Sequence, residues 1–248
     1  MDTLLIDNVA DIQKINELST NKTLIIIKHI HEEFSLPSNI ECATLYLDNC
    51  KGITDLPEDL CTMKLVIQGA SGITEFSSNK PYFPAYVDSL VIKDMSYIPH
   101  NLTTRNLTII DSDIEVFDVF GNYKTLEFIN CNKLNHIIPL NTEELNISNC
   151  ESITNLDGIA VKYAVNISNA PNLENCDFLK NGTNMFYTNI HIANCPKITT
   201  LPGIATQNLN LYKTGITRHE MDKINEKSII MNFVGQSRRG GYGEISKF

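Results

Sequence analysis

The residues best suited to chemistry are two histidines and two glutamates near the N-terminus, in the run His29-Ile30-His31-Glu32-Glu33. Histidines at positions i and i+2 of a strand share one face, and a carboxylate could complete a metal site with them. The sequence shows no obvious fourth ligand for such a site. In the alternative interpretation, Ile30 enters the core and its polar neighbours face solvent. We favour this second interpretation and expect neither a metal nor any other cofactor.

Cysteine is the second residue type that could react or bind a metal. The chain has seven cysteines, and no two of them are at C-x-x-C spacing. Most fall where the pattern described below requires an apolar side chain, which favours buried, reduced thiols that act as small hydrophobic residues. Cys131 and Cys150 are expected to be neighbours in one ladder. No phosphate-binding glycine loop, nucleophile elbow or zinc-finger spacing is present, so we expect a protein that is not an enzyme.

Charge and hydropathy restrict the partners and the compartment. The formal net charge is −9 and the sequence pI is near 5.1, which opposes broad electrostatic binding to nucleic acid or to an anionic membrane. A single Arg-Arg-Gly-Gly run begins at Arg238, which is a weak nucleic-acid signal. Neither a secretory signal nor an apolar run long enough for a membrane helix is seen. We therefore expect a cytoplasmic protein with no nucleic-acid or membrane partner.

A repeat of about twenty residues organises the chain. Residues 43–60, ATLYLDNCKGITDLPEDL, place apolar residues on apolar residues when they are shifted by that length in either direction. Each repeat has an anchor followed two residues later by a second apolar residue, which predicts a short strand with one face turned inward. The anchors are Ile25, Leu45, Leu65, Leu90, Leu107, Leu126, Leu145, Val165, Ile190, Leu209 and Ile229.

The pattern L-x-L-x-x-[NC]-x-x-[LI] resembles the leucine-rich repeat over about residues 22 to 234. The clearest copies read LYLDNCKGITDLP, LNISNCESITNLD and IHIANCPKITTLP. Their short period and Leu-Pro steps are similar to the short bacterial-type repeats, although several copies carry Cys where the family more often has Asn. The resemblance implies an α/β solenoid: a right-handed superhelix with one curved parallel sheet and a mostly non-helical convex side.

The ends of the chain differ from the repeat. We expect one solenoid domain, 1–234, with an N-terminal cap at 1–22 in which Val9, Ile12, Ile15 and Leu18 form a short amphipathic helix. A capping-box match, T-x-x-E from Thr217, predicts a helix over 217–227 and a final strand over 228–233, which together form the C-terminal cap, 217–234. The tail, 235–248, is expected to be flexible or to cover the sheet edge loosely.

The concave sheet face is the surface with functional content, because it is the usual binding surface of a solenoid. Its N-terminal half is rich in apolar and aromatic residues, and its C-terminal half is a ladder of asparagine and serine around His191. An apolar row on an exposed face favours an interaction patch, whereas β-branched residues there could simply stabilise strands. The predicted partner-binding residues are Tyr46, Val66, Val91, Lys93, Ile110, Glu127, Ile129, His191 and Tyr212.

These observations favour a non-enzymatic module that binds a protein partner through the concave face. Three alternatives remain: a viral or bacterial effector that sequesters a host factor in the host cytoplasm, a small-ligand binder or enzyme that uses the polar half, and a structural assembly subunit. Two long, aromatic-rich segments, 77–88 and 177–188, could either bind a partner or cover the core. The partner's identity and the oligomeric state do not follow from the sequence.

Overall fold

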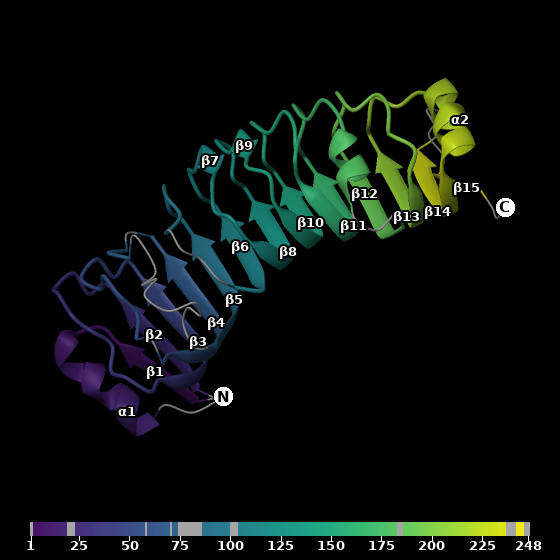
Figure 1. The fold of residues 1–248 in the computed structure, drawn as a ribbon. Helices are drawn as coiled ribbons and strands as arrows, with labels where there is room; N and C mark the ends of the chain where they lie inside the picture. The colour runs from purple at the N-terminus through teal and green to yellow at the C-terminus, as the bar shows by residue number, and fades with distance from the viewer. Residues whose placement is uncertain are drawn as a thin grey trace. The chain divides into compact units, whose positions relative to one another are not determined.

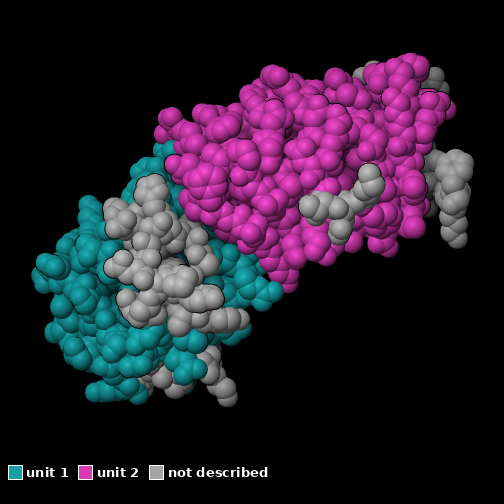
Figure 2. Space-filling model, in the orientation of Figure 1, with its two compact units in different colours: residues 1–114 teal, residues 115–248 magenta. Residues whose placement is uncertain are grey.

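The chain divides into two compact units, residues 1–114 (unit 1) and residues 115–248 (unit 2), which Figure 2 draws in teal and magenta. The computed structural model describes residues 2–18, 23–57, 59–69, 71–73, 86–99, 104–182, 186–236 and 242–245.

Unit 1 is a parallel sheet with a helical cap at its first strand (Figure 1). Neighbours in the chain are neighbours in the sheet, and every pairing between them is parallel. Its strands are β1 Asp2–Ile6, β2 Thr23–Lys28, β3 Glu41–Asp48, β4 Cys61–Gln68, β5 Tyr86–Lys93 and β6 Asn106–Ile110. The cap consists of the 3₁₀ helix η1, Val9–Lys14, and the single turn α1, Ile15–Leu18.

Unit 2 repeats this arrangement and ends in a second helix and an antiparallel strand (Figure 1). Its parallel strands are β8 Asn122–Ile129, β10 Asn141–Ser148, β11 Ala160–Ser168, β12 Tyr187–Ala193, β13 Ala205–Tyr212 and β14 Ile229–Gln236. On the loop side, β7 Val116–Phe117 and β9 His136–Ile137 form a two-stranded ladder. The remaining elements are the 3₁₀ helix η2 Asp177–Asn181, the helix α2 Arg218–Lys227 and β15 Tyr242–Ile245.

Alternation of side chains explains the strands and locates the core. In β3, Leu45 and Leu47 are buried while Tyr46 between them is half-buried on the other face, and β10 repeats this with Leu145 and Ile147. Because one turn of chain is too short to bury its own apolar residues, each turn must stack on its neighbours. The predicted parallel sheet with few helices is therefore confirmed in both units, and each is a solenoid-like stack.

A buried threonine hydroxyl bonds the backbone near the start of several strands. The register between β10 and β11 also shifts between Thr142 and Glu144, because β11 has one residue more than β10 over this stretch. The buried Thr142 Oγ1 donates a hydrogen bond to Glu144 O at 2.8 Å, and Thr62 and Thr206 make the same i to i+2 bond at 3.0 and 2.9 Å. Each hydroxyl thus gives the carbonyl two residues later in its own strand a hydrogen-bond donor.

The turn after most strands of the repeat has a residue in the left-handed region, often followed by a small buried residue. Asn49, Asn149 and Asn194 have φ between 51° and 54°, a region that asparagine tolerates better than most residues. The next residue is often cysteine, whose thiol lies against the last strand carbonyls; Cys50 Sγ is 3.3 Å from Ile27 O. No disulfide joins any of the seven cysteines, all of which are described, and six are buried, so the predicted placement of the thiols in the core is confirmed for those six.

Both predicted terminal helices form. Ile12 and Ile15 of the N-terminal cap are buried, and α2 begins after Thr217, whose Oγ1 accepts a hydrogen bond from Glu220 N at 3.2 Å. Among the described residues, no helix combines the length and apolar character needed to cross a bilayer.

The expected register of the last strand is wrong. Leu209 pairs with Phe233 rather than with the predicted anchor Ile229, which pairs with Ala205. The cause is that anchors occupy the fifth residue of these strands, as Leu45 does in β3 and Leu209 in β13, and Phe233 is the fifth residue of β14. Within the predicted tail, 242–245 pairs with β14 as the antiparallel strand β15.

Of the two long aromatic segments, the structure describes most of the second. Phe178 and Tyr187 are buried and Tyr187 Oη donates to Leu179 O at 2.8 Å, whereas Phe186 is 41% exposed. Segment 177–188 therefore covers the core with two of its three aromatic rings. Most of segment 77–88 lies outside the described residues.

Candidate functional site

The outward face is defined here as the face of each sheet that is turned away from the buried strand residues. In unit 1 its central column is apolar over five consecutive strands, because the pairing places these residues side by side: Leu5, Ile26, Tyr46, Val66 and Val91. Neighbouring members are about 4.8 Å apart, so the column runs roughly 19 Å across the sheet. Thr108 continues it on β6.

The exposure of this column differs from the expectation. Leu5 is 51% exposed and Ile26 and Tyr46 are half-buried, but Val66 and Val91 are only 7% and 8% exposed. Register alone gave the position of these valines and not their accessibility. The accessible part of the column is therefore its N-terminal part, on β1 to β3.

Tyr46 is held in place across the column. Its hydroxyl donates a hydrogen bond to Gln68 Oε1 on β4, so the side chain reaches diagonally past Val66 to the next strand. Burial raises the pKa of Tyr46 above its usual value, and the nearby carboxylates of Asp48 and Asp94 add to the shift. The phenol therefore stays neutral at physiological pH and presents a fixed aromatic edge.

Charged and polar residues flank the apolar column of unit 1. On the carboxyl side Lys28, Asp48, Gln68, Lys93 and Ile110 are aligned by the register, so the predicted pair Lys93 and Ile110 are direct neighbours. The column is thus an apolar strip beside a polar margin.

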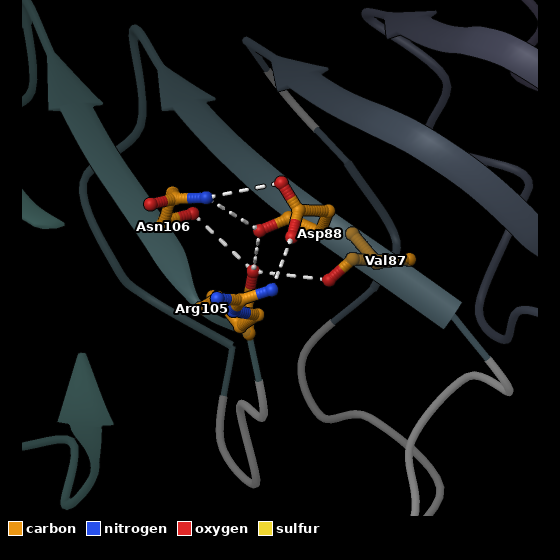
Figure 3. Close-up of polar contacts among 5 residues, drawn as sticks. Val87, Asp88, Arg105 and Asn106 are labelled. Carbon is orange, nitrogen blue, oxygen red and sulfur yellow. Dashed lines mark hydrogen bonds and ion pairs between the residues drawn. The ribbon is translucent and has the colours of Figure 1, made fainter. Parts of the chain in front are cut away.

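At the amino end, a polar network fastens β5 to β6 (Figure 3). Asn106 Nδ2 donates to both Asp88 O and Asp88 Oδ2 at 3.1 Å, and Arg105 Nη1 lies 3.7 Å from Asp88 Oδ1. Thr104 Oγ1 donates to Val87 O at 3.2 Å. These contacts fix the two strands at this margin of the strip.

The other predicted site residues lie on the outward face of unit 2, where the surroundings are polar. Glu127 pairs with Asn146 and Ile129 with Ser148. His191 lies between Asn166 and Asn210, and Tyr212 lies beside Ala193. The structure therefore divides the predicted site into an apolar column in unit 1 and a polar field in unit 2.

In the histidine-glutamate run the isoleucine enters the core and its polar neighbours are exposed. Ile30 is buried, His29 has a φ of 57° in the turn after β2, and His29 and His31 are exposed. Among the described residues, no three His, Cys, Asp or Glu side chains gather closely enough to hold a metal ion.

Sequence reasoning missed two sets of exposed apolar side chains. Leu5 extends the apolar column onto β1, which is shorter than most of the other strands. Ile229, Met231 and Val234 on β14 are 66%, 58% and 51% exposed, but the register error placed Ile229 and Met231 in the core. Numbering the residues from the first residue of each strand, and not from the apolar anchor, would have identified these exposed side chains.

Comparisons with protein-family models, with curated protein sequences and with solved structures return no match. The function of this surface is therefore inferred from its own residues and geometry.

Proposed function

We propose that the chain is a right-handed, leucine-rich-repeat-like solenoid that binds a protein partner through the outward face of unit 1 and catalyses no reaction. Two observations support the proposal: the resemblance of the repeat to the leucine-rich repeat, and the accessible part of the apolar column. Leu5, Ile26 and Tyr46 would be the contacts at its centre, with Lys93 and Ile110 at its margin.

One observation carries the proposal: an apolar column on the sheet face opposite the core. A sheet face that only meets water is ordinarily polar along its strands, because apolar side chains there gain nothing from burial within the chain. Leu5 is 51% exposed. Contiguous apolar side chains on an exposed face usually mark an interaction site. Burying it against a partner recovers the hydrophobic free energy.

The fixed position of Tyr46 supports the same conclusion. Interface hot spots are enriched in tyrosine, and a side chain already immobilised loses little conformational entropy on binding. The hydrogen bond to Gln68 provides that immobilisation before a partner arrives.

The test is affinity capture from native host lysate with the full chain and with a double variant, Leu5→Ser plus Tyr46→Ala. We expect the variant to retain the partner about tenfold less, because two central apolar contacts are lost. Met63→Ala is the matched control, since Met63 is 65% exposed on β4 but lies outside the column.

Circular dichroism and thermal melting must show that both variants keep the fold. A partner retained equally by the double variant and by Met63→Ala would contradict the assignment of this face.

A further inference from the structure

Strand β1 ends the sheet of unit 1, and among the described strands it pairs with β2 alone. A strand in this position turns a row of backbone N–H and C=O groups away from the sheet, where another extended chain can pair with them. In unit 2 the last parallel strand, β14, is paired on its far side by the short antiparallel strand β15. No described strand adjoins β1 in the same way.

The exposure of the apolar column indicates what this edge lacks. Leu5 of β1 is 51% exposed, whereas Ile26 and Tyr46, which have a strand on both sides, are half-buried. Leu4 and Ile6 are buried, so β1 is well packed on its core side. Leu5 therefore lacks a neighbour on the outward face in the direction away from β2, and a strand added there would supply one.

The chain around this edge is acidic. Between the start of β1 and the end of α1, four carboxylates and one ammonium give a net side-chain charge of −3, from Asp2, Asp7, Asp11, Glu17 and Lys14. Asp2 begins β1 and Asp7 directly follows it, and both are exposed. Opposite charges on two surfaces favour their association, so this edge favours a positively charged chain.

We propose that β1 accepts a short, extended, basic segment of a partner protein as an additional strand. The inference rests on the proposed function of unit 1 and names the kind of partner that its outward face takes. The segment carries an apolar residue opposite Leu5, which extends the column by one strand, and lysine or arginine opposite Asp2 and Asp7. Main-chain hydrogen bonds supply affinity in such a pairing, and the side chains supply specificity.

Charge opposes a second copy of this chain as the added strand. An antiparallel pair of β1 strands centred between Leu4 and Leu5 would place Asp2 of each copy opposite Asp7 of the other. Like charges directly opposite each other across two strands are destabilising. Charged residues on edge strands protect proteins from pairing with their own copies, and here the same charges attract a basic segment.

The test uses the full chain and dye-labelled hexapeptides with both ends blocked, and fluorescence anisotropy measures binding. The probe KTVVTK has a basic residue at each end and presents a valine to Leu5 in either strand direction, and ETVVTE is its acidic counterpart. We expect KTVVTK to bind at least tenfold more tightly than ETVVTE, and its affinity to fall as the salt concentration is raised.

Backbone methylation tests whether the peptide pairs as a strand. Alternate N–H groups of an extended chain point to opposite sides, so only one alternate set faces β1. We therefore expect that methylating one alternate set of nitrogens in KTVVTK abolishes binding, while methylating the other set changes the affinity by less than about threefold. Equal effects of the two sets would contradict strand addition.

Charge reversal on the chain tests the edge without altering the apolar column. Asp2→Lys plus Asp7→Lys should weaken binding of KTVVTK at least tenfold and strengthen binding of ETVVTE. Asp118→Lys plus Asp157→Lys is the matched control, because it makes the same change of charge at two exposed positions of unit 2, and it should stay within about threefold.

Circular dichroism must show that both variants keep the fold. If the reversal variant does not, Asp2→Asn plus Asp7→Asn replaces it and should remove the preference for KTVVTK over ETVVTE.

Four results would overturn the proposal: no binding of KTVVTK at millimolar concentration, equal binding of ETVVTE, equal effects of the two methylated sets, or equal binding by the reversal and control variants. Dimerisation of the full chain that KTVVTK competes away would identify a second copy as the occupant and would also overturn it. Capture from lysate, and its loss in Leu5→Ser plus Tyr46→Ala, does not depend on these results, so this inference can fail while the proposed function stands.

Discussion

Asparagine stabilises the ends of four strands of unit 2 through both its backbone and its side chain. Asn130, Asn149, Asn169 and Asn194 all adopt φ near 54°, and each backbone N–H donates to the last residue of the next strand. Their amides also form a ladder, with Nδ2 to Oδ1 distances of 2.6 to 2.7 Å. The sequence shows an asparagine before the small buried residue in each of these turns. The hydrogen bonds that this asparagine makes depend on the neighbouring turns of the stack.

Asn149→Ala should destabilise the protein by about 2 kcal/mol. A non-glycine residue without a polar side chain pays about 1–2 kcal/mol in the left-handed region, and two ladder hydrogen bonds are lost as well. Asn149→Gly removes only the ladder bonds and should cost roughly half as much. Urea unfolding of the three proteins measures both values. Equal losses for the alanine and glycine variants would show that backbone conformation is not the larger cause.

Element η2 and strand β12 are joined by a buried phenol. Tyr187 Oη donates to Leu179 O at 2.8 Å, and burial raises the pKa of Tyr187 to about 12 from an ordinary value near 10. Because the folded state holds this proton more tightly, the stabilisation is complete below about pH 10 and is lost as pH rises from 10 to 12. Sequence reasoning found the aromatic segment but not which ring would turn inward.

Tyr187→Phe should cost about 1 kcal/mol at pH 7, because Leu179 O loses its donor, and it should reduce the loss of stability between about pH 10 and 12. Part of that loss will remain, since burial also raises the pKa of Tyr123 and of the Cys176 thiol. Tyr212→Phe, at a half-buried position, serves as the control for the loss of a tyrosine hydroxyl. The measurement is urea unfolding at a series of pH values, and an unchanged alkaline slope in Tyr187→Phe would contradict this account.

At the scale of the whole molecule, the burial of the seven cysteine thiols indicates how completely the turns stack on one another. Six are buried and Cys61 is intermediate. Burial raises the pKa of Cys42, Cys50 and Cys195, so few thiolates form at neutral pH, and the thiolate is the reactive form.

The native protein should therefore react quickly with an aromatic disulfide reagent at only one thiol, and at all seven in guanidinium chloride. Cys61→Ser should remove the fast phase, while Cys50→Ser should leave it in place. Absorbance of the released thiol follows the reaction. Several fast thiols in the native chain would mean that the turns open more readily than their burial indicates.

The apolar pattern of the sequence correctly predicted the period, the inward residues and the parallel register of most strands. A repeat of apolar anchors such as Leu45 and Leu65 allows only one stacking that buries them all, because a slip of one residue would turn every side chain to the other face. It also placed Tyr46 beside Val66 and His191 beside Asn166 on the outward face.

Which of those residues are accessible, and which hydrogen bonds they make, follows from the folded structure and not from the pattern. Val66 and Val91 are nearly buried, Phe233 rather than Ile229 pairs with the anchor Leu209, and the asparagine ladders join side chains about twenty residues apart. Exposure and hydrogen bonding depend on atoms contributed by other turns, whose distances no local pattern contains. The repeat therefore fixes where a side chain stands, and its neighbours fix what it can do there.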